Sequence, residues 1–229
     1  MEKENEKKTS IIDKASKSTQ NKINDILPKK YHEVMTTVIK SMTKAVLLGS
    51  KYTSIKPYPK MSLMEHDYLL DEKTKTYRTT AVIEGASTGA GGILLGLSDF
   101  PLLLSIKIKF LYDVAAIYGY DTNDYKERLY ILNIFQLAFS SQNHINDIFK
   151  NIENWNEYSQ SLPNNINDFD WLTFQREYRD YLDLAKLLQL LPGIGAVVGA
   201  YVNHKLLNKL SKTARLAYLM RIEGELRRG

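Results

Sequence analysis

The stretch GASTGAGGILLGL (85–97) and the shorter PGIGAVVG (192–199) contain eight of the 12 glycines in this 229-residue chain. A glycine costs a helix about 1 kcal/mol relative to alanine, so such clusters need a compensating gain. The glycines spaced by three or four residues share one helical face: Gly85, Gly89, Gly92 and Gly96 in the first stretch, Gly195 and Gly199 in the second. G-x-x-x-G spacing lets two backbones approach closely. We predict that helices 82–97 and 194–209 pack together along these faces.

Outside these stretches, apolar residues recur along the chain with the period of a helix. Two closely spaced prolines interrupt this pattern and predict a linker. The expected segments are helices at 11–27 and 31–49, the linker at 56–60, and helices at about 74–97, 171–190 and 194–227. The pattern indicates a chain that is helical nearly throughout.

Two further helices are expected between these segments. Ser98 or Asp99 is placed to cap one of them, with Pro101 in its first turn and Gly119 just past its end.

The second of these helices has a start signal of its own. Asp124 and Glu127 have the spacing of a capping box, which predicts a helix that continues to about Ile152. TTAVI (79–83) is the one plausible strand. The sequence therefore predicts an all-α fold.

Charge is concentrated at the two ends of the chain. The 31 Lys and Arg exceed the 26 Asp and Glu, giving a net charge of +5. Residues 1–30 hold eight lysines and five acids, and residues 205–229 hold seven bases and two acids. Basic ends attract phosphate. We expect anionic lipid and no nucleic acid, because zinc-finger spacing and RNP-like motifs are absent. We divide the chain into a basic polar N-terminal extension (1–30) and one helical domain (31–229).

Composition excludes several kinds of site. The chain has no cysteine, so it has no disulfide, no thiol nucleophile and no cysteine-bearing zinc site. The first ten residues, MEKENEKKTS, are polar and lead into no long apolar stretch, which argues against a secretory signal. We expect a cytoplasmic protein.

The apolar stretches are short for a membrane span, which needs about 20 residues. Residues 187–203 are 17 residues without a formal charge, and residues 85–98 are only 14. Asp99 follows directly, and a carboxylate at mid-bilayer costs about 2.5–3.5 kcal/mol. We therefore expect surface association or shallow insertion, with the basic C-terminal tail on anionic headgroups.

Three segments in this order resemble the EcsC family over roughly residues 74–220. They are GASTGAGGILLGLSDFPLLL, then YDVAAIYGYDTNDYKERLY, then LPGIGAVVGAYVNHKL. The resemblance implies an all-helical protein close to a membrane. The family is named for a gene neighbouring an ABC transporter, so the resemblance implies such a transporter as a partner. It transfers no catalytic residue. The candidate functional residues in the matching motifs are Asp99, Tyr118, Asp121, Arg128 and Asn203.

An enzyme is the main alternative. Gly85-Ala-Ser87-Thr-Gly89 satisfies G-x-S-x-G, the nucleophile elbow of α/β-hydrolases, and TTAVI is the strand that could precede it. The other triad members are open: His144 or His204 as base, and Asp99, Asp113 or Asp121 as acid. An elbow needs a parallel sheet behind it, so Ser87 is better explained as a small helix-packing residue.

No motif for a cofactor is present. The chain lacks G-x-x-x-x-G-K-[ST], GAGGIL (89–94) misses the third glycine of G-x-G-x-x-G, and the four histidines have no ligand spacing such as H-E-x-x-H. We therefore predict no cofactor and no metal. The expected function is that of a non-enzymatic, membrane-associated protein on the cytoplasmic side that binds lipid or a membrane protein. The Ser87-dependent hydrolase and a soluble scaffold are the alternatives.

Overall fold

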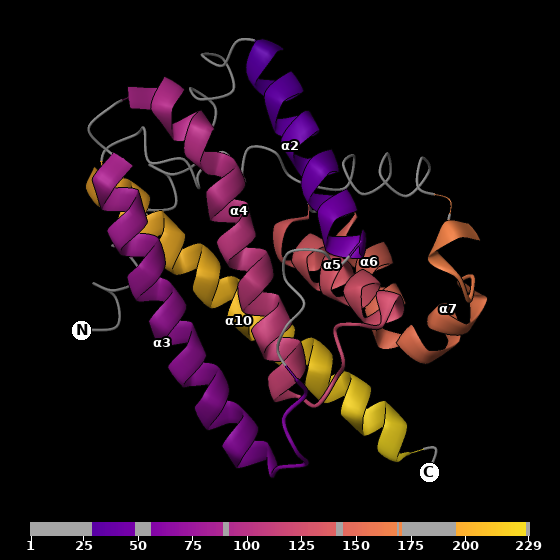
Figure 1. Cartoon of the computed structure of the whole chain (residues 1–229). Helices are drawn as coiled ribbons and strands as arrows, with labels where there is room; N and C mark the ends of the chain where they lie inside the picture. Colours follow the sequence, from indigo (N-terminus) through magenta and orange to yellow (C-terminus); the bar gives the residue numbers. More distant parts are fainter. Residues whose placement is uncertain are drawn as a thin grey trace, which may run out of the picture.

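The computed structural model describes residues 29–48, 56–88, 92–140, 144–168, 170 and 196–227, and every regular element there is helical (Figure 1). The helices are α2 (Lys29–Leu48), α3 (Leu63–Thr88), α4 (Gly92–Ile117), α5 (Tyr125–Phe139), α6 (Ile145–Glu153), α7 (Trp155–Ser161), the 3-10 turn η1 (Ile166–Asp168) and α10 (Ala196–Leu226). The predicted all-α fold is confirmed. The helices expected at 11–27 and 171–190 lie outside the described residues.

Helix α3 begins well before the start we predicted near Thr74. The Ser62 hydroxyl accepts a hydrogen bond from the Glu65 backbone N–H at 3.3 Å, and the Glu65 carboxylate accepts one from the Ser62 backbone N–H at 2.8 Å. This is a capping box, which satisfies two amides at the helix start. TTAVI, the one segment that also fitted a strand, is helical, because these residues lie inside α3. The Thr79 and Thr80 hydroxyls donate to carbonyls four residues earlier.

The predicted cap of α4 at Ser98 or Asp99 is wrong. The helix begins at Gly92, so both residues lie within it, and Pro101 lies inside the helix rather than in its first turn. The single helix expected over 82–97 is also wrong, because α3 ends at Thr88. Apolar sequence continues on both sides of this junction, so the apolar pattern did not reveal where one helix ends and the next begins.

The end of α4 agrees with the prediction. Gly119 lies just past the helix with a φ of +86°, a conformation that glycine adopts at little cost. The Gly119 N–H donates to the Ala116 carbonyl and the Tyr120 N–H donates to the Ala115 carbonyl, each at 3.0 Å. These two bonds form a Schellman motif, which ends the helix and turns the chain toward α5.

Helix α5 lies at the centre of the fold and packs against α2, α4, α6 and α10 (Figure 1). Its first turn is capped as expected: the Asp124 carboxylate accepts a hydrogen bond from the Lys126 N–H at 2.9 Å. It ends at Phe139 rather than near Ile152, and a separate helix, α6, follows from Ile145. Most side chains of α5 are buried, so this helix is a core element on all sides.

Helices α3 and α10 run antiparallel and pack closely (Figure 1). The Thr74 and Ser211 hydroxyls lie 2.8 Å apart, Arg78 donates to Asn208 at 3.3 Å, and Asp67 pairs with Arg215. Since residue numbers rise along α3 as they fall along α10, the end of α3 lies near the start of α10.

The antiparallel packing of α3 and α10 determines which of their glycines lie at the same end of the helix pair. Gly85 lies near the end of α3 and Gly199 near the start of α10, while Gly92 and Gly96 lie in α4. Gly89 and Gly195 lie outside the described residues. The register brings the glycine-bearing ends of α3 and α10 to the same end of the pair. Packing along the glycines themselves stays a prediction.

Candidate functional site

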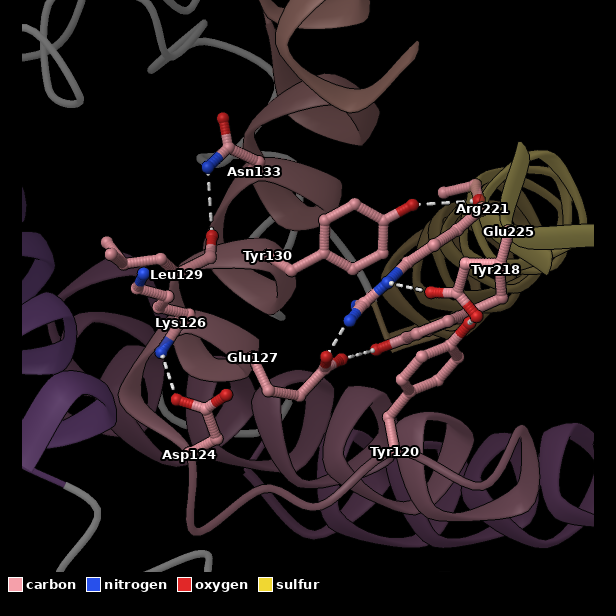
Figure 2. A network of polar contacts seen from close by, with 11 residues as sticks. Tyr120, Asp124, Lys126, Glu127, Leu129, Tyr130, Asn133, Tyr218, Arg221 and Glu225 are labelled. Carbon is pink, nitrogen blue, oxygen red and sulfur yellow. Dashed lines mark hydrogen bonds and ion pairs between the residues drawn. The ribbon is translucent and has the colours of Figure 1, made fainter. Parts of the chain in front are cut away.

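A buried ion pair joins α5 to α10 (Figure 2). Glu127 points from α5 into the interior, where its carboxylate accepts a hydrogen bond from the Tyr218 hydroxyl at 2.6 Å and pairs with Arg221 at 2.5 Å. The Glu127 side chain is 3% exposed and that of Arg221 14%. The capping-box role predicted for Glu127 is therefore wrong: burial of the first turn of α5 points this side chain inward, toward α10.

Aromatic rings enclose the guanidinium of Arg221. Its central carbon lies 3.9 Å from the ring centre of Tyr120 and 4.8 Å from that of Tyr130, which are cation–π distances. The Tyr120 hydroxyl and Arg221 both donate to Glu225, at 3.2 and 3.3 Å (Figure 2). The Tyr130 hydroxyl donates to the backbone carbonyl of Ala217 at 2.8 Å. The network thus connects α5, α10 and the turn after α4.

The electrostatics of this network follow from burial and pairing. Burial raises the pKa of the Glu127 carboxyl, while Arg221 and Tyr218 oppose that shift. Burial disfavours the charged form of Arg221, but the neighbouring Glu127 carboxylate leaves its pKa above the usual value. Burial and Glu127 both raise the pKa of Tyr218, which stays a hydrogen-bond donor. Each of these buried groups therefore has a partner within the network, as buried polar and charged groups require.

Three candidates from the family resemblance gather at the connection between α4 and α5. The Arg128 side chain donates to the Leu47 carbonyl at 2.8 Å and to the carbonyls of Thr122 and Asn123 at 3.0 and 2.6 Å. It therefore ties the end of α2 to this connection.

The other two candidates shape the same turn. Asp121 accepts from the Asn123 backbone N–H at 2.9 Å, which closes an Asx turn. Tyr118 is 5% exposed and stacks on Tyr218, with ring centres 5.2 Å apart. Asp121 thus shapes the turn, and Tyr118 packs against α10.

The described residues lack the strand that the hydrolase alternative needs. Ser87 lies inside α3 and no strand precedes it in the described part of the chain, so the nucleophile elbow lacks its strand. Asp113 accepts hydrogen bonds from Lys73, Lys109 and Tyr77. Asp99 and Asn203 lie in α4 and α10, and their side chains lie outside what the structure describes.

The outer face of α10 carries a stripe of lysines and a leucine. Lys205, Lys209, Lys212 and Leu216 are exposed and recur every three or four residues, so they share one face. We call this face the lysine–leucine stripe. Leu216 is 55% exposed, and no acidic residue interrupts the stripe. A shorter stripe on α2 has the same character: Lys40, Lys44 and Leu48, which is also 55% exposed.

The segment around α6 and α7 has the opposite charge. Between residues 144 and 170 one lysine, Lys150, stands against five exposed acids. These acids are Asp147, Glu153, Glu157, Asp168 and Asp170. The exposed surface is therefore basic along the lysine–leucine stripe and acidic along α6, α7 and η1.

A family model described as the EcsC protein family matches residues 1–222 of the chain. The chain belongs to the EcsC family. It is 45% identical over 217 residues to Protein EcsC of Bacillus subtilis (strain 168), an alignment that covers 94% of this chain and 89% of that protein. Uncharacterized protein YdbA of the same strain is 29% identical over 171 residues, which are 74% of this chain and 62% of that protein. No solved structure matches.

Membership of the EcsC family agrees with the helical fold and assigns no reaction. Among the helices that the structure describes, none combines the length and apolar character needed to cross a bilayer. The network around Glu127 was missed by sequence reasoning, although a charged residue beside the apolar run LYILNIF is a signal for a buried charge. The sequence around Glu127 does not indicate its partner Arg221, which lies 94 residues away.

The buried residue His66 allows the effect of burial on a pKa to be tested in this EcsC-family chain. It is 7% exposed and packs on Tyr118, with ring centres 4.9 Å apart. Burial lowers the pKa of His66, although Asp67 and Glu65 oppose the shift. A depressed pKa gives stability that is present above the ordinary histidine value of about 6.5 and is lost as the pH falls.

We expect His66→Gln to flatten the dependence of the unfolding free energy on pH below about pH 6.5, because the titrating group is removed. Urea unfolding of the wild type and the variant at several pH values measures this dependence. Equal slopes in the wild type and His66→Gln would contradict the prediction.

Proposed function

We propose that this chain is a peripheral membrane protein that binds anionic phospholipid through the lysine–leucine stripe of α10. The stripe is the observation that carries the proposal. A lysine close to an anionic membrane surface contributes about 1 kcal/mol, so three lysines on one face supply a useful attraction. The exposed Leu216 adds apolar contact with the boundary between headgroups and acyl chains.

The uneven distribution of charge supports a defined orientation. With the lysine–leucine stripe against the membrane, the acidic residues of α6, α7 and η1 are repelled by the same lipid. The cytoplasmic leaflet carries the anionic lipid, so we place the protein on that side of the membrane. We propose that its membrane protein partner is an ABC transporter, as the family resemblance implies.

Vesicle flotation tests the proposal. The wild type should float with vesicles that contain phosphatidylglycerol and not with phosphatidylcholine alone, and salt should weaken binding. Lys205→Glu with Lys212→Glu should abolish flotation, because each reversal replaces an attraction by a repulsion. The control reverses Lys126 and Lys150, away from the stripe, and should float normally. A wild type that stays unbound at low salt contradicts the proposal. Binding to native membranes but not to lipid vesicles would identify a protein partner instead.

A further inference from the structure

Two lysines converge on one buried carboxylate between α3 and α4. Lys73 of α3 donates to one Asp113 oxygen at 3.1 Å, and Lys109 of α4 donates to the other at 3.0 Å. The Tyr77 hydroxyl donates to the first oxygen at 3.0 Å. The Asp113 side chain is 5% exposed, whereas those of Lys73 and Lys109 are 36% and 33% exposed. The carboxylate is thus buried, whereas the two lysine side chains that bind it are partly exposed.

The charges in this cluster do not cancel. Two ammonium groups share one carboxylate, and burial together with Asp113 raises the pKa of Tyr77, so the phenol stays neutral. An ammonium has three N–H donors, and one from each lysine serves Asp113. Among the residues that the structure describes, the cluster therefore presents a net positive charge with donors left for an anion. Because Asp113 holds both lysines in place, less side-chain entropy remains to be lost on binding.

An apolar strip adjoins the lysines along α4. Leu102, Ile106, Lys109 and Asp113 recur every three or four residues and lie on one face. Leu102 is 49% exposed and Ile106 is partly exposed. From Lys109 toward the start of α4, the exposed face thus changes from cationic to apolar. A membrane lipid has the same order, with an anionic headgroup followed by an apolar chain.

We propose that Lys73 and Lys109 bind the phosphate of a membrane lipid with a phosphomonoester headgroup, with Leu102 and Ile106 beside its acyl chain. The inference rests on the proposed membrane binding and adds a headgroup preference to it. A phosphomonoester carries about −1.5 to −2 charges at neutral pH, whereas a phosphodiester carries one. Two ammonium groups on one site favour the more highly charged group. The α10 stripe supplies attraction to any anionic lipid.

The experiment compares vesicles that contain phosphatidic acid with vesicles that contain phosphatidylglycerol, adjusted to equal surface charge. We expect the wild type to bind the phosphatidic acid vesicles about tenfold more tightly, because the two lysines attract the additional negative charge of the phosphomonoester. Lys73→Gln with Lys109→Gln should lose this preference and still bind both vesicles. Lys40→Gln with Lys44→Gln removes the same charge from α2 and should keep the preference.

The outcomes separate the two proposals. Equal binding of the wild type to both vesicles, or a preference that survives in the Lys73 and Lys109 variant, overturns this site and leaves the proposed function standing. Binding to neither vesicle overturns both. Glycerol phosphate that binds the two lysines as tightly as the vesicles do would overturn the lipid assignment. If the double variant unfolds, Lys109→Gln alone keeps the bond from Lys73 to Asp113 and should weaken the preference.

Discussion

Arg221→Ala is expected to destabilise the protein by about 3–5 kcal/mol, because it leaves the Glu127 carboxylate buried without its ion-pair partner. The Glu127 side chain is 3% exposed, so water replaces the lost guanidinium only in part. The Tyr218 hydroxyl remains as a single donor. The rings of Tyr120 and Tyr130 also lose the cation that lies over them. Urea unfolding of the wild type and the variant measures the difference.

Two controls identify the cause of this loss. Arg227→Ala removes the same side chain from an exposed pair with Glu223, 76% and 63% exposed, and should cost at most about 1 kcal/mol. Acid should reduce the penalty of Arg221→Ala. Burial already raises the pKa of Glu127, and a carboxyl whose folded pKa is raised costs least at low pH, where it is protonated. A loss below about 1 kcal/mol for Arg221→Ala would show that the buried pair is dispensable.

Arg128→Met should destabilise the protein by about 2–4 kcal/mol, because three backbone carbonyls lose a charged donor. Those of Leu47, Thr122 and Asn123 accept from its guanidinium at 2.6–3.0 Å. Arg128 is 8% exposed, so water does not readily take its place. The loss should appear as a lower urea midpoint with an unchanged slope.

Arg128→Lys tests whether the fork of the guanidinium matters rather than its charge. An ammonium is a compact point donor and cannot reach all three carbonyls, so we expect it to recover only part of the stability. Lys126→Met, at the partly exposed start of the same helix, should change stability by at most about 0.5 kcal/mol. Full recovery in Arg128→Lys would contradict the geometric explanation.

Local features of the fold could be predicted from the sequence. The helical period of apolar residues indicated an all-α protein, and Gly119 and Asp124 marked the end of α4 and the start of α5. These signals work because a cap or a Schellman turn is formed by residues within one helical turn of each other. The capping box of Ser62 and Glu65 was equally local and lay in the sequence as S-x-x-E.

The helical class, several helix ends and membership of the EcsC family can be recognised without the structure. The contacts of the charged residues cannot, because they follow from the packing of the helices. Glu127 has the spacing of a local cap, yet its partner is Arg221, 94 residues away, and Asp113 contacts Lys73 of another helix. The physical reason is that these contacts depend on how α3, α4, α5 and α10 pack. A buried charge without a partner costs free energy, so each of these charges pairs with the group that the packing brings near.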